Sequence, residues 1–214
     1  MPALCVYCWF RPRIPMTATP STMLALGTPL PSFRLPDLDG RLVSPDDVRD
    51  APALLVAFIC HHCPFVRHIR SAFARFARDY QARGLAVIAI NSNDVDEFPE
   101  DGPDGMRQES RDAGYVFPYL FDESQQIAKS FRAACTPDLF LFDATRALVY
   151  RGQFDGSRPR NAVPVTGRDL RAACDALLDG RPVPPVQTPS VGCNIKWKPG
   201  NEPNYGSVPL TIQR

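Results

Sequence analysis

Residues 54–64 read Leu54-Leu55-Val56-Ala57-Phe58-Ile59-Cys60-His61-His62-Cys63-Pro64. The first six of these residues are apolar and mostly branched or aromatic, a composition that predicts a buried strand. After this stretch, apolar side chains recur at helical spacing, at Val66, Ile69, Phe73, Phe76, Ala77 and Tyr80. The two cysteines, separated by two residues, are therefore expected on a strand-to-helix turn.

The start of a helix favours a negatively charged sulfur. The first backbone N–H groups have no partner within the helix, and the helix dipole places partial positive charge there. We therefore expect Cys60 to lie exposed at the turn and to ionise more readily than an ordinary thiol. Cys63 is expected inside the first helical turn, where its sulfur is better shielded.

Length and composition fit one domain with extensions. The chain has 214 residues, of which 44% are hydrophobic, and this is enough for a single large core. A formal net charge of +1 gives no field that attracts nucleic acid or an anionic membrane surface. No apolar stretch approaches the ~20 residues that a membrane-spanning helix needs. All basic residues except Lys129, Lys196 and Lys198 are arginines, which suggests a bacterial source.

The first 25 residues are expected to form a disordered leader, in which Met16 offers an alternative start of translation. They show no hydrophobic periodicity and contain several prolines. The apolar run 4–10 has no basic residue before it and is followed by Arg11 and Arg13, the reverse of a secretory signal. We therefore expect a cytoplasmic, reducing location, where a CxxC pair is redox-active or metal-binding rather than structural.

The segments around the cysteine stretch predict a mixed α/β domain. Short strands at 33–35 and 41–43 flank an Asp-Gly turn and predict a hairpin. Ser44 has the character of a helix N-cap. Residues 85–90 predict a second buried strand, and because a helix separates it from strand 54–59, the two strands should be parallel.

The remaining segments complete a domain at 26–182, followed by a tail at 183–214. The acidic residues of 91–105 fit no EF-hand and predict a solvated loop. Several prolines keep the tail extended, and Ile195 and Trp197 are expected to hold it on the domain. The other expected elements are helices 106–113, 123–133 and 167–179, and strands 119–121, 139–143 and 148–150.

Four separated segments resemble a single family. They are residues 60–65, Ile90-Asn91-Ser92-Asn93-Asp94, Cys135-Thr136-Pro137-Asp138 and Gly192-Cys193-Asn194-Ile195-Lys196-Trp197. In this order they resemble the thioredoxin-like redoxin proteins grouped with alkyl hydroperoxide reductase and thiol-specific antioxidant, in the branch with a Cys-x-His-Cys-Pro active site. The resemblance covers about residues 26–205. It implies a thioredoxin-like fold: a central mixed sheet flanked by helices, with an N-terminal hairpin and an extended C-terminal tail.

The resemblance also implies a thiol–disulfide oxidoreductase. Cys60 is expected to attack a substrate disulfide as a thiolate, and Cys63 to resolve the mixed disulfide by closing the Cys60–Cys63 bond. Pro137 is expected to be a cis-proline that faces the CxxC pair, with Thr136 contacting an extended substrate. The expected partners are a protein or small-molecule disulfide and a thiol reductant. No cofactor and no metal are expected.

Several further residues have two open interpretations. His61 and His62 either stabilise the thiolate and shift the couple toward an oxidant, or are solvated surface side chains. Cys135 is either a buried, inert thiol or an auxiliary thiol close enough to exchange with the pair. Cys193 is either a resolving thiol on the tail or part of a docking segment. The neighbouring His68 is expected on an exposed helix face.

Two alternative functions compete with this interpretation. A peroxiredoxin-like peroxidase carries Pro-x-x-x-Thr/Ser-x-x-Cys, and aligning Cys63 with its cysteine puts Cys60 at the Thr position and Val56 at the Pro position. Two of the three signature residues are then absent, so we do not favour this reading. A metal-binding module would use Cys60 and Cys63 with His62 or His68 for Zn²⁺ or Cu⁺. The chain has no His pair at ligand spacing, and its other CxxC pair, Cys5 and Cys8, lies in the expected leader with no further ligands after it.

Overall fold

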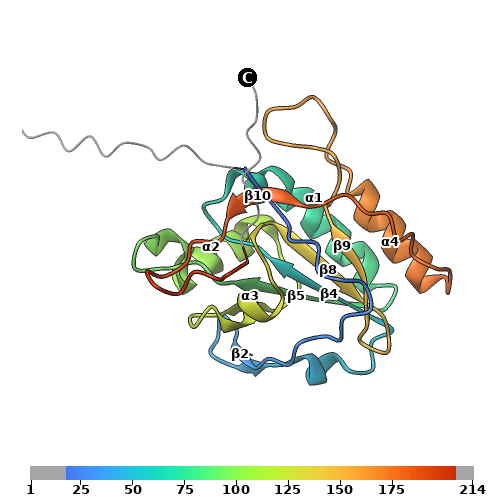
Figure 1. Cartoon of the computed structure of the whole chain (residues 1–214), viewed down its shortest axis with the longest axis horizontal. Helices are drawn as coiled ribbons and strands as arrows, with labels where there is room; N and C mark the ends of the chain where they lie inside the picture. The colour runs from blue at the N-terminus through green and yellow to red at the C-terminus, as the bar shows by residue number, and fades with distance from the viewer. Residues whose placement is uncertain (1–17, 206–214) are drawn as a thin grey trace, which may run out of the picture.

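The computed structural model describes residues 18–205. Its centre is a five-stranded sheet with the order β6-β5-β4-β8-β9 (Figure 1). Strands β4, β5 and β6 are parallel, whereas β8 is antiparallel to β4 and β9 is antiparallel to β8. The predicted α/β class with a central mixed sheet is confirmed. The five strands are β4 (Ala53–Phe58), β5 (Leu85–Asn91), β6 (Tyr119–Phe121), β8 (Asp138–Phe142) and β9 (Leu148–Gly152).

The cysteine stretch forms the expected strand-helix-strand unit. All six residues of β4 are buried, because β4 is the middle strand and both faces of the sheet are covered. Helix α1 (Pro64–Gln81) follows it and buries the apolar residues that recur at helical spacing in the sequence. One face of α1 therefore packs on the sheet. β4 and β5 pair in parallel, as their separation by a helix predicts.

Alternate residues of the sheet face two separate cores. In β4, Leu55 belongs to the core under α1, whereas Val56 belongs to the opposite core. Helices α1 and α4 cover the first core, and α3 with the β2–β3 hairpin covers the second (Figure 1). These elements are α4 (Arg168–Leu178), α3 (Gln126–Ser130), β2 (Leu35–Pro36) and β3 (Leu42–Val43). The predicted N-terminal hairpin is thus confirmed.

A second, three-stranded sheet brings the C-terminal tail back to the cysteine turn. Its order is β1-β10-β7, with both pairings antiparallel. The strands are β1 (Ala18–Pro20), β10 (Val191–Asn194) and β7 (Cys135–Thr136). Gly192 makes the close approach of β10 possible, because a Cβ at this position would lie 2.0 Å from the backbone oxygen of Thr136. The tail is therefore an integral part of this sheet as well as an extended segment.

Four local expectations need correction. The leader does not extend to residue 25, because β1 pairs with β10; residues 1–17 and 206–214 lie outside the described part. The helix expected at 123–133 is only α3, because Asp122 Oδ2 accepts the backbone N–H groups of Ile127 and Ala128 and holds the preceding residues in a turn.

The helix expected after Ser44 is a single 3-10 turn, η1 (Pro45–Val48). The acidic loop contains η2 (Pro99–Asp101), and α2 (Pro103–Ala113) begins three residues earlier than expected.

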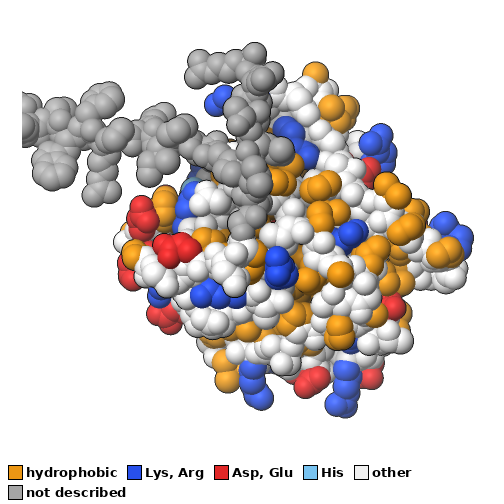
Figure 2. All heavy atoms as spheres, in the orientation of Figure 1, with side chains coloured by type: hydrophobic (Ala, Val, Ile, Leu, Met, Phe, Trp, Pro, Cys, Tyr) orange, Lys and Arg blue, Asp and Glu red, His pale blue; other side chains and the backbone are white. Residues whose placement is uncertain are grey.

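The described surface carries both signs of charge. On the face drawn in Figure 2, the described acidic and basic side chains are interspersed and form no continuous basic stripe. This distribution agrees with the net charge of +1. None of the helices within residues 18–205 combines the length and the apolar character that a membrane span requires.

The close approach at Gly192 leads to a stability prediction. We expect Gly192→Ala to lower the free energy of unfolding by at least about 2 kcal/mol, because the added methyl group meets backbone that cannot rotate away. Gly156→Ala is the matched control: its Cβ would meet only a Val163 methyl group at 3.9 Å, so its effect should stay within about 0.5 kcal/mol. Urea unfolding measures both, and equal losses in the two variants would contradict the proposed contact.

Candidate redox site

Both cysteines of the CxxC pair contact one residue of the facing loop. Cys60 Sγ lies 3.4 Å from the Thr136 hydroxyl oxygen, and Cys63 Sγ lies 3.1 Å from the Thr136 carbonyl oxygen. The Thr136–Pro137 peptide bond is cis. Thr136 ends β7 and leads into β8, which pairs with β4. The sheet thus brings the Thr-Pro step to the end of the strand that carries the cysteines.

The expected shielding of Cys63 is confirmed, but the expected exposure of Cys60 and the expected helix position of Cys63 are wrong. Cys60 has no exposed surface, and neither has Cys63. Cys63 is the N-cap of α1 rather than a residue of its first turn, since the helix begins at Pro64. The tail contributes to the burial of Cys63, because β10 places Cys193 Sγ 3.0 Å from Cys63 Sγ. The spacing of apolar residues in the sequence cannot show that β10 packs against the cysteine turn, because Cys193 lies 130 residues after Cys63.

The environment of the pair favours the thiolate on Cys63. Burial alone opposes ionisation of Cys63, but the neighbouring thiols of Cys193 and Cys60 and the side chain of Thr136 outweigh it, so its pKa is well below the usual range. The backbone N–H of Val66 adds to this effect without making a full capping hydrogen bond. Burial raises the pKa of Cys60 well above its usual value, and the neighbouring negative groups raise it further. The helix N-terminus therefore acts on Cys63, not on Cys60 as we expected.

His62 is fixed beside the pair by a buried carboxylate. Asp101 accepts hydrogen bonds from the backbone N–H of His62 at 2.9 Å and from His62 Nδ1, and Phe98 stacks on the imidazole ring. Partial burial lowers the pKa of His62, but the hydrogen bond and charge of Asp101 outweigh it, and the net shift is upward. Of the two interpretations of His62, the geometry favours a tuned side chain over a solvated one.

Asp101 is a site residue that the sequence analysis missed. It lies in the acidic segment expected to be solvated, yet it has no exposed surface. Asn91 and Asn93 donate hydrogen bonds to its backbone oxygen and its carboxylate, respectively, which compensates part of the cost of burying the charge. The motif at 90–94 marked this region, but nothing in the local pattern distinguishes Asp101 from the exposed acids around it.

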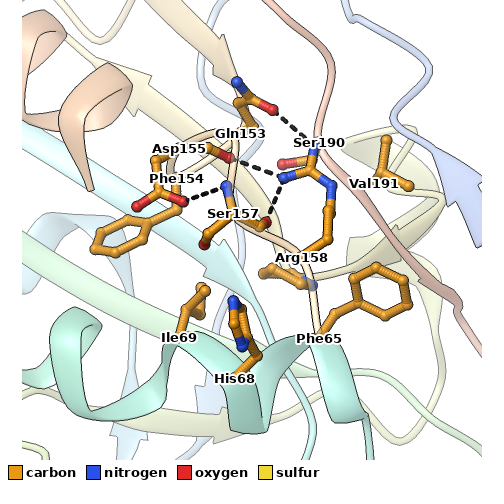
Figure 3. A pocket seen from close by; sticks show the side chains of 11 residues that line it. Phe65, His68, Ile69, Gln153, Phe154, Asp155, Ser157, Arg158, Ser190 and Val191 are labelled. Atoms are coloured by element: carbon orange, nitrogen blue, oxygen red, sulfur yellow. Dashed lines mark hydrogen bonds between the residues drawn. The ribbon is translucent and has the colours of Figure 1, made fainter. Parts of the chain in front are cut away.

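The two other histidines have different surroundings. His61 Nδ1 is buried without a hydrogen-bond partner, and burial lowers the pKa of the ring, so His61 does not resemble His62. His68 is half-buried rather than exposed, and it lines a hollow between α1 and the segment around Arg158, with Pro137 at its border (Figure 3). The hollow encloses about 20 Å³. This is the room that one water molecule occupies, so it is not a substrate pocket.

Among the other described cysteines, Cys135 fits the inert interpretation. Its sulfur contacts the backbone oxygen of Pro137 at 3.5 Å, and burial raises its pKa well above the usual range. Because Cys135 and Thr136 are adjacent in β7, their side chains point to opposite sides of the strand. Cys174 lies in the core side of α4, as its helical spacing predicts.

The donor set beside the pair argues against a metal site. One ligand atom each of Cys60, His62 and Asp101 lies within 4.8 Å of the others. However, both oxygens of Asp101 already accept hydrogen bonds, one from the His62 backbone and the other from His62 Nδ1 and Asn93. A cation at Asp101 Oδ2 would have to replace one of the two donors on that oxygen, so at Oδ2 the geometry favours hydrogen bonding over metal binding.

A second buried carboxyl group lies behind the pair. Glu109 on α2 accepts hydrogen bonds from Tyr115 and Tyr119, and Tyr119 also donates to the backbone oxygen of Ile59, next to Cys60. Burial raises the pKa of Glu109 to about 7. Glu109 falls within a predicted helix, but no sequence signal shows that it faces the core.

Comparison with known proteins identifies relatives of the chain. The AhpC/TSA family model matches residues 26–151. No curated protein matches the chain. A crystal structure of a hypothetical protein from Sinorhizobium meliloti 1021 is 55% identical, covers 85% of this chain and 100% of its own, and has a TM-score of 0.84. An uncharacterized conserved protein from Geobacillus kaustophilus is 51% identical, with coverages of 87% and 100% and a TM-score of 0.85.

A more distant structure shares the fold alone. A thiol:disulfide interchange protein of the thioredoxin family from Chlorobium tepidum is 18% identical, covers 72% of this chain and 99% of its own, and has a TM-score of 0.55. This similarity confirms the thioredoxin-like architecture.

The His62–Asp101 contact leads to a titration prediction. We expect the pKa of His62 to lie above the ordinary value of ~6.5, because Asp101 favours the charged ring, and to fall in Asp101→Asn. Proton NMR of the imidazole C–H signals measures it. His61 is the internal control in the same spectra, because its pKa lies below the ordinary value. If His62 titrates at or below His61 in the unchanged protein, the proposed ion pair is wrong.

Glu109 leads to a pH-dependence prediction. A carboxyl group whose pKa is higher in the folded protein than in the unfolded chain costs stability as it ionises. This cost is absent below the ordinary pKa of ~4.3 and complete above about 7. We therefore expect Glu109→Gln to remove a fall in the free energy of unfolding over this pH range. Urea unfolding at several pH values tests it, with exposed Glu100→Gln as control. Parallel curves for Glu109→Gln and the unchanged protein would refute the shift.

Proposed function

The chain belongs to the AhpC/TSA family, and on that premise we propose that it is a thiol–disulfide oxidoreductase with Cys60 and Cys63 as its redox pair. We place it in the branch whose active site reads Cys-x-His-Cys-Pro. One observation carries the proposal: both sulfurs contact Thr136, directly before the cis-proline. Each thiol also influences the pKa of the other, so the two sulfurs act as one pair.

The surroundings of the sulfurs support Cys63 as the attacking atom. The Cys63 thiolate attacks a substrate disulfide R–S–S–R′, forms a Cys63–S–R bond, and releases R′–S⁻, which takes up a proton. Cys60 then loses its proton and attacks Cys63 Sγ, which closes the Cys60–Cys63 disulfide and releases R–S⁻. The substrate gains two electrons and the pair loses two. This order reverses the roles that the sequence favoured, because the pKa shifts run in the opposite direction.

His62 sets the direction in which the couple tends to react. A protonated imidazole held by Asp101 favours the nearby Cys63 thiolate. A stabilised thiolate means a stabilised reduced form, and this makes the disulfide form a stronger oxidant. The same mechanism runs in reverse when the Cys60–Cys63 disulfide accepts electrons from a thiol reductant.

Burial of the pair limits which substrates reach it. Neither sulfur has exposed surface, so a protein disulfide gains access only after the cysteine turn or β10 moves, whereas a small disulfide needs a smaller opening. The partners that we propose are a disulfide substrate, protein or small molecule, and a thiol reductant, in a reducing cytoplasm. The proposed chemistry uses no cofactor.

A peroxiredoxin-like peroxidase would also use Cys63 as its attacking sulfur, but the residues that shape the pocket of such a peroxidase are absent. Cys63 takes the place of the cysteine in the peroxiredoxin signature. Val56 takes the place of the proline, but it packs in the core on the other face of the sheet from Cys63. Cys60 replaces the threonine hydroxyl. We therefore retain peroxide as a substrate to be measured rather than as the proposed one.

Serine variants of the pair test the proposed function. With glutathione disulfide as substrate, Cys63→Ser should lose the reaction, because it lacks the stabilised thiolate. Cys60→Ser should still react with glutathione disulfide at Cys63 but should not form the Cys60–Cys63 bond. Mass spectrometry of acid-quenched samples measures both, with Cys174→Ala as the core-cysteine control.

Two outcomes would change the assignment. Mixed-disulfide formation at Cys60 in the Cys63→Ser variant, at the rate of the unchanged protein, would restore Cys60 as the attacking residue. Rapid turnover of hydrogen peroxide that survives in Cys60→Ser and disappears in Cys63→Ser would favour the peroxidase.

A further inference from the structure

We propose that Cys193 is a third redox thiol, which forms a disulfide with Cys63 in competition with the Cys60–Cys63 bond. This inference rests on the proposed function and assigns a resolving role to a residue of the C-terminal tail. Its basis is the position of the Cys63 sulfur relative to Cys60 and Cys193. Cys63 Sγ lies 3.0 Å from Cys193 Sγ, and both Cys63 and Cys60 contact Thr136.

The backbone holds Cys193 in place for this bond. Cys193 pairs with Thr136 on one side and with Ala18 on the other, so β10 is the central strand of its sheet. Gly192 allows the strand to lie against the Thr136 backbone. A disulfide has a sulfur–sulfur distance of about 2.05 Å, so the observed gap closes with a movement of about 1 Å, and β10 need not leave its sheet.

The proton positions also suit a Cys63–Cys193 reaction. The hydrogen bond to Cys63 and burial both raise the pKa of Cys193, so Cys193 is the protonated partner and Cys63 the thiolate. Cys193 therefore stabilises the attacking thiolate while the pair is reduced. Once the Cys63 sulfur is bound in a mixed disulfide, it no longer carries the charge that raises the pKa of Cys193.

The proposed step balances with the chemistry of the pair. After Cys63–S–R has formed, Cys193 loses its proton to the solvent and attacks Cys63 Sγ. The Cys63–Cys193 bond forms, and R–S⁻ leaves and takes up a proton. A later attack of Cys60 on Cys63 Sγ moves the disulfide to Cys60–Cys63 and releases Cys193 as a thiol. In both routes the two protein thiols lose two electrons to the substrate.

Cys135 provides the matched comparison for Cys193. Both are buried cysteines in the same three-stranded sheet. Cys135 contacts the Pro137 backbone oxygen instead of a sulfur. Replacing Cys135 by alanine therefore removes a similar volume without removing a reacting group.

The experiment is disulfide mapping of the full chain after a short reaction with glutathione disulfide, acid quenching and mass spectrometry. We expect Cys60→Ala to give a Cys63–Cys193 cross-link as its main product. The double variant Cys60→Ala/Cys193→Ala should accumulate glutathione on Cys63 and lose the cross-link. Cys60→Ala/Cys135→Ala should keep the cross-link at the level of Cys60→Ala. Thermal unfolding verifies that each variant is folded, and Cys60→Ser replaces Cys60→Ala where the alanine variant is not.

The possible results separate this inference from the proposed function. If folded Cys60→Ala and Cys60→Ser both stop at the glutathione adduct of Cys63 while the unchanged protein forms Cys60–Cys63, the role of Cys193 is refuted and the proposed function stands. If the unchanged protein forms no bond at Cys63, the proposed function itself is wrong. A Cys63–Cys135 cross-link in Cys60→Ala, formed in place of Cys63–Cys193 and absent from Cys60→Ala/Cys135→Ala, would assign the third thiol to Cys135 and overturn the inference.

Discussion

The proposed reaction depends on keeping a sulfur anion inside the protein. An ion in a buried position is unstable unless donors replace the water that it has lost. Around Cys63 this support comes from Cys60 in the same turn and from two distant parts of the chain, the side chain of Thr136 and the thiol of Cys193. The N-terminus of α1 adds the positive end of its dipole. The remaining features of the site serve to hold these donors against one sulfur.

The tail is held by the same network that positions His62. Asn93 donates to the Asp101 carboxylate, and its side-chain oxygen accepts the backbone N–H of Lys196. Lys196 in turn accepts hydrogen bonds from the backbone of Asp94 and the side chain of Gln125. The charge of Asp101 and the position of the cover over the cysteines are thus connected by direct hydrogen bonds. Breaking the Asn93 contacts would disturb both at once.

Much of the fold can be predicted from the sequence, because the strongest signals in the sequence are local. The uninterrupted apolar run of β4, the helical spacing in α1 and the second apolar run of β5 each predict one element, and their order predicts the parallel unit. The site is less predictable because its decisive contacts join distant residues. Neither the burial of Asp101 beside His62 nor the contact of Cys193 with Cys63 has a local pattern. The motif segments at 90–94 and 192–197 marked both regions through a family resemblance, without revealing what the residues do.

The replacement of a hydroxyl by a thiol at position 60 gives this site its particular chemistry. In the peroxiredoxin signature, a threonine or serine precedes the reactive cysteine by three residues and shapes the pocket around its thiolate. Cys60 occupies that place, and its thiol still lowers the pKa of Cys63. Unlike a hydroxyl, the Cys60 thiol can itself form a bond to the oxidised sulfur. The substitution therefore keeps the electrostatic support for Cys63 and adds a second electron donor within reach of it, and this favours disulfide exchange over a reaction confined to one cysteine.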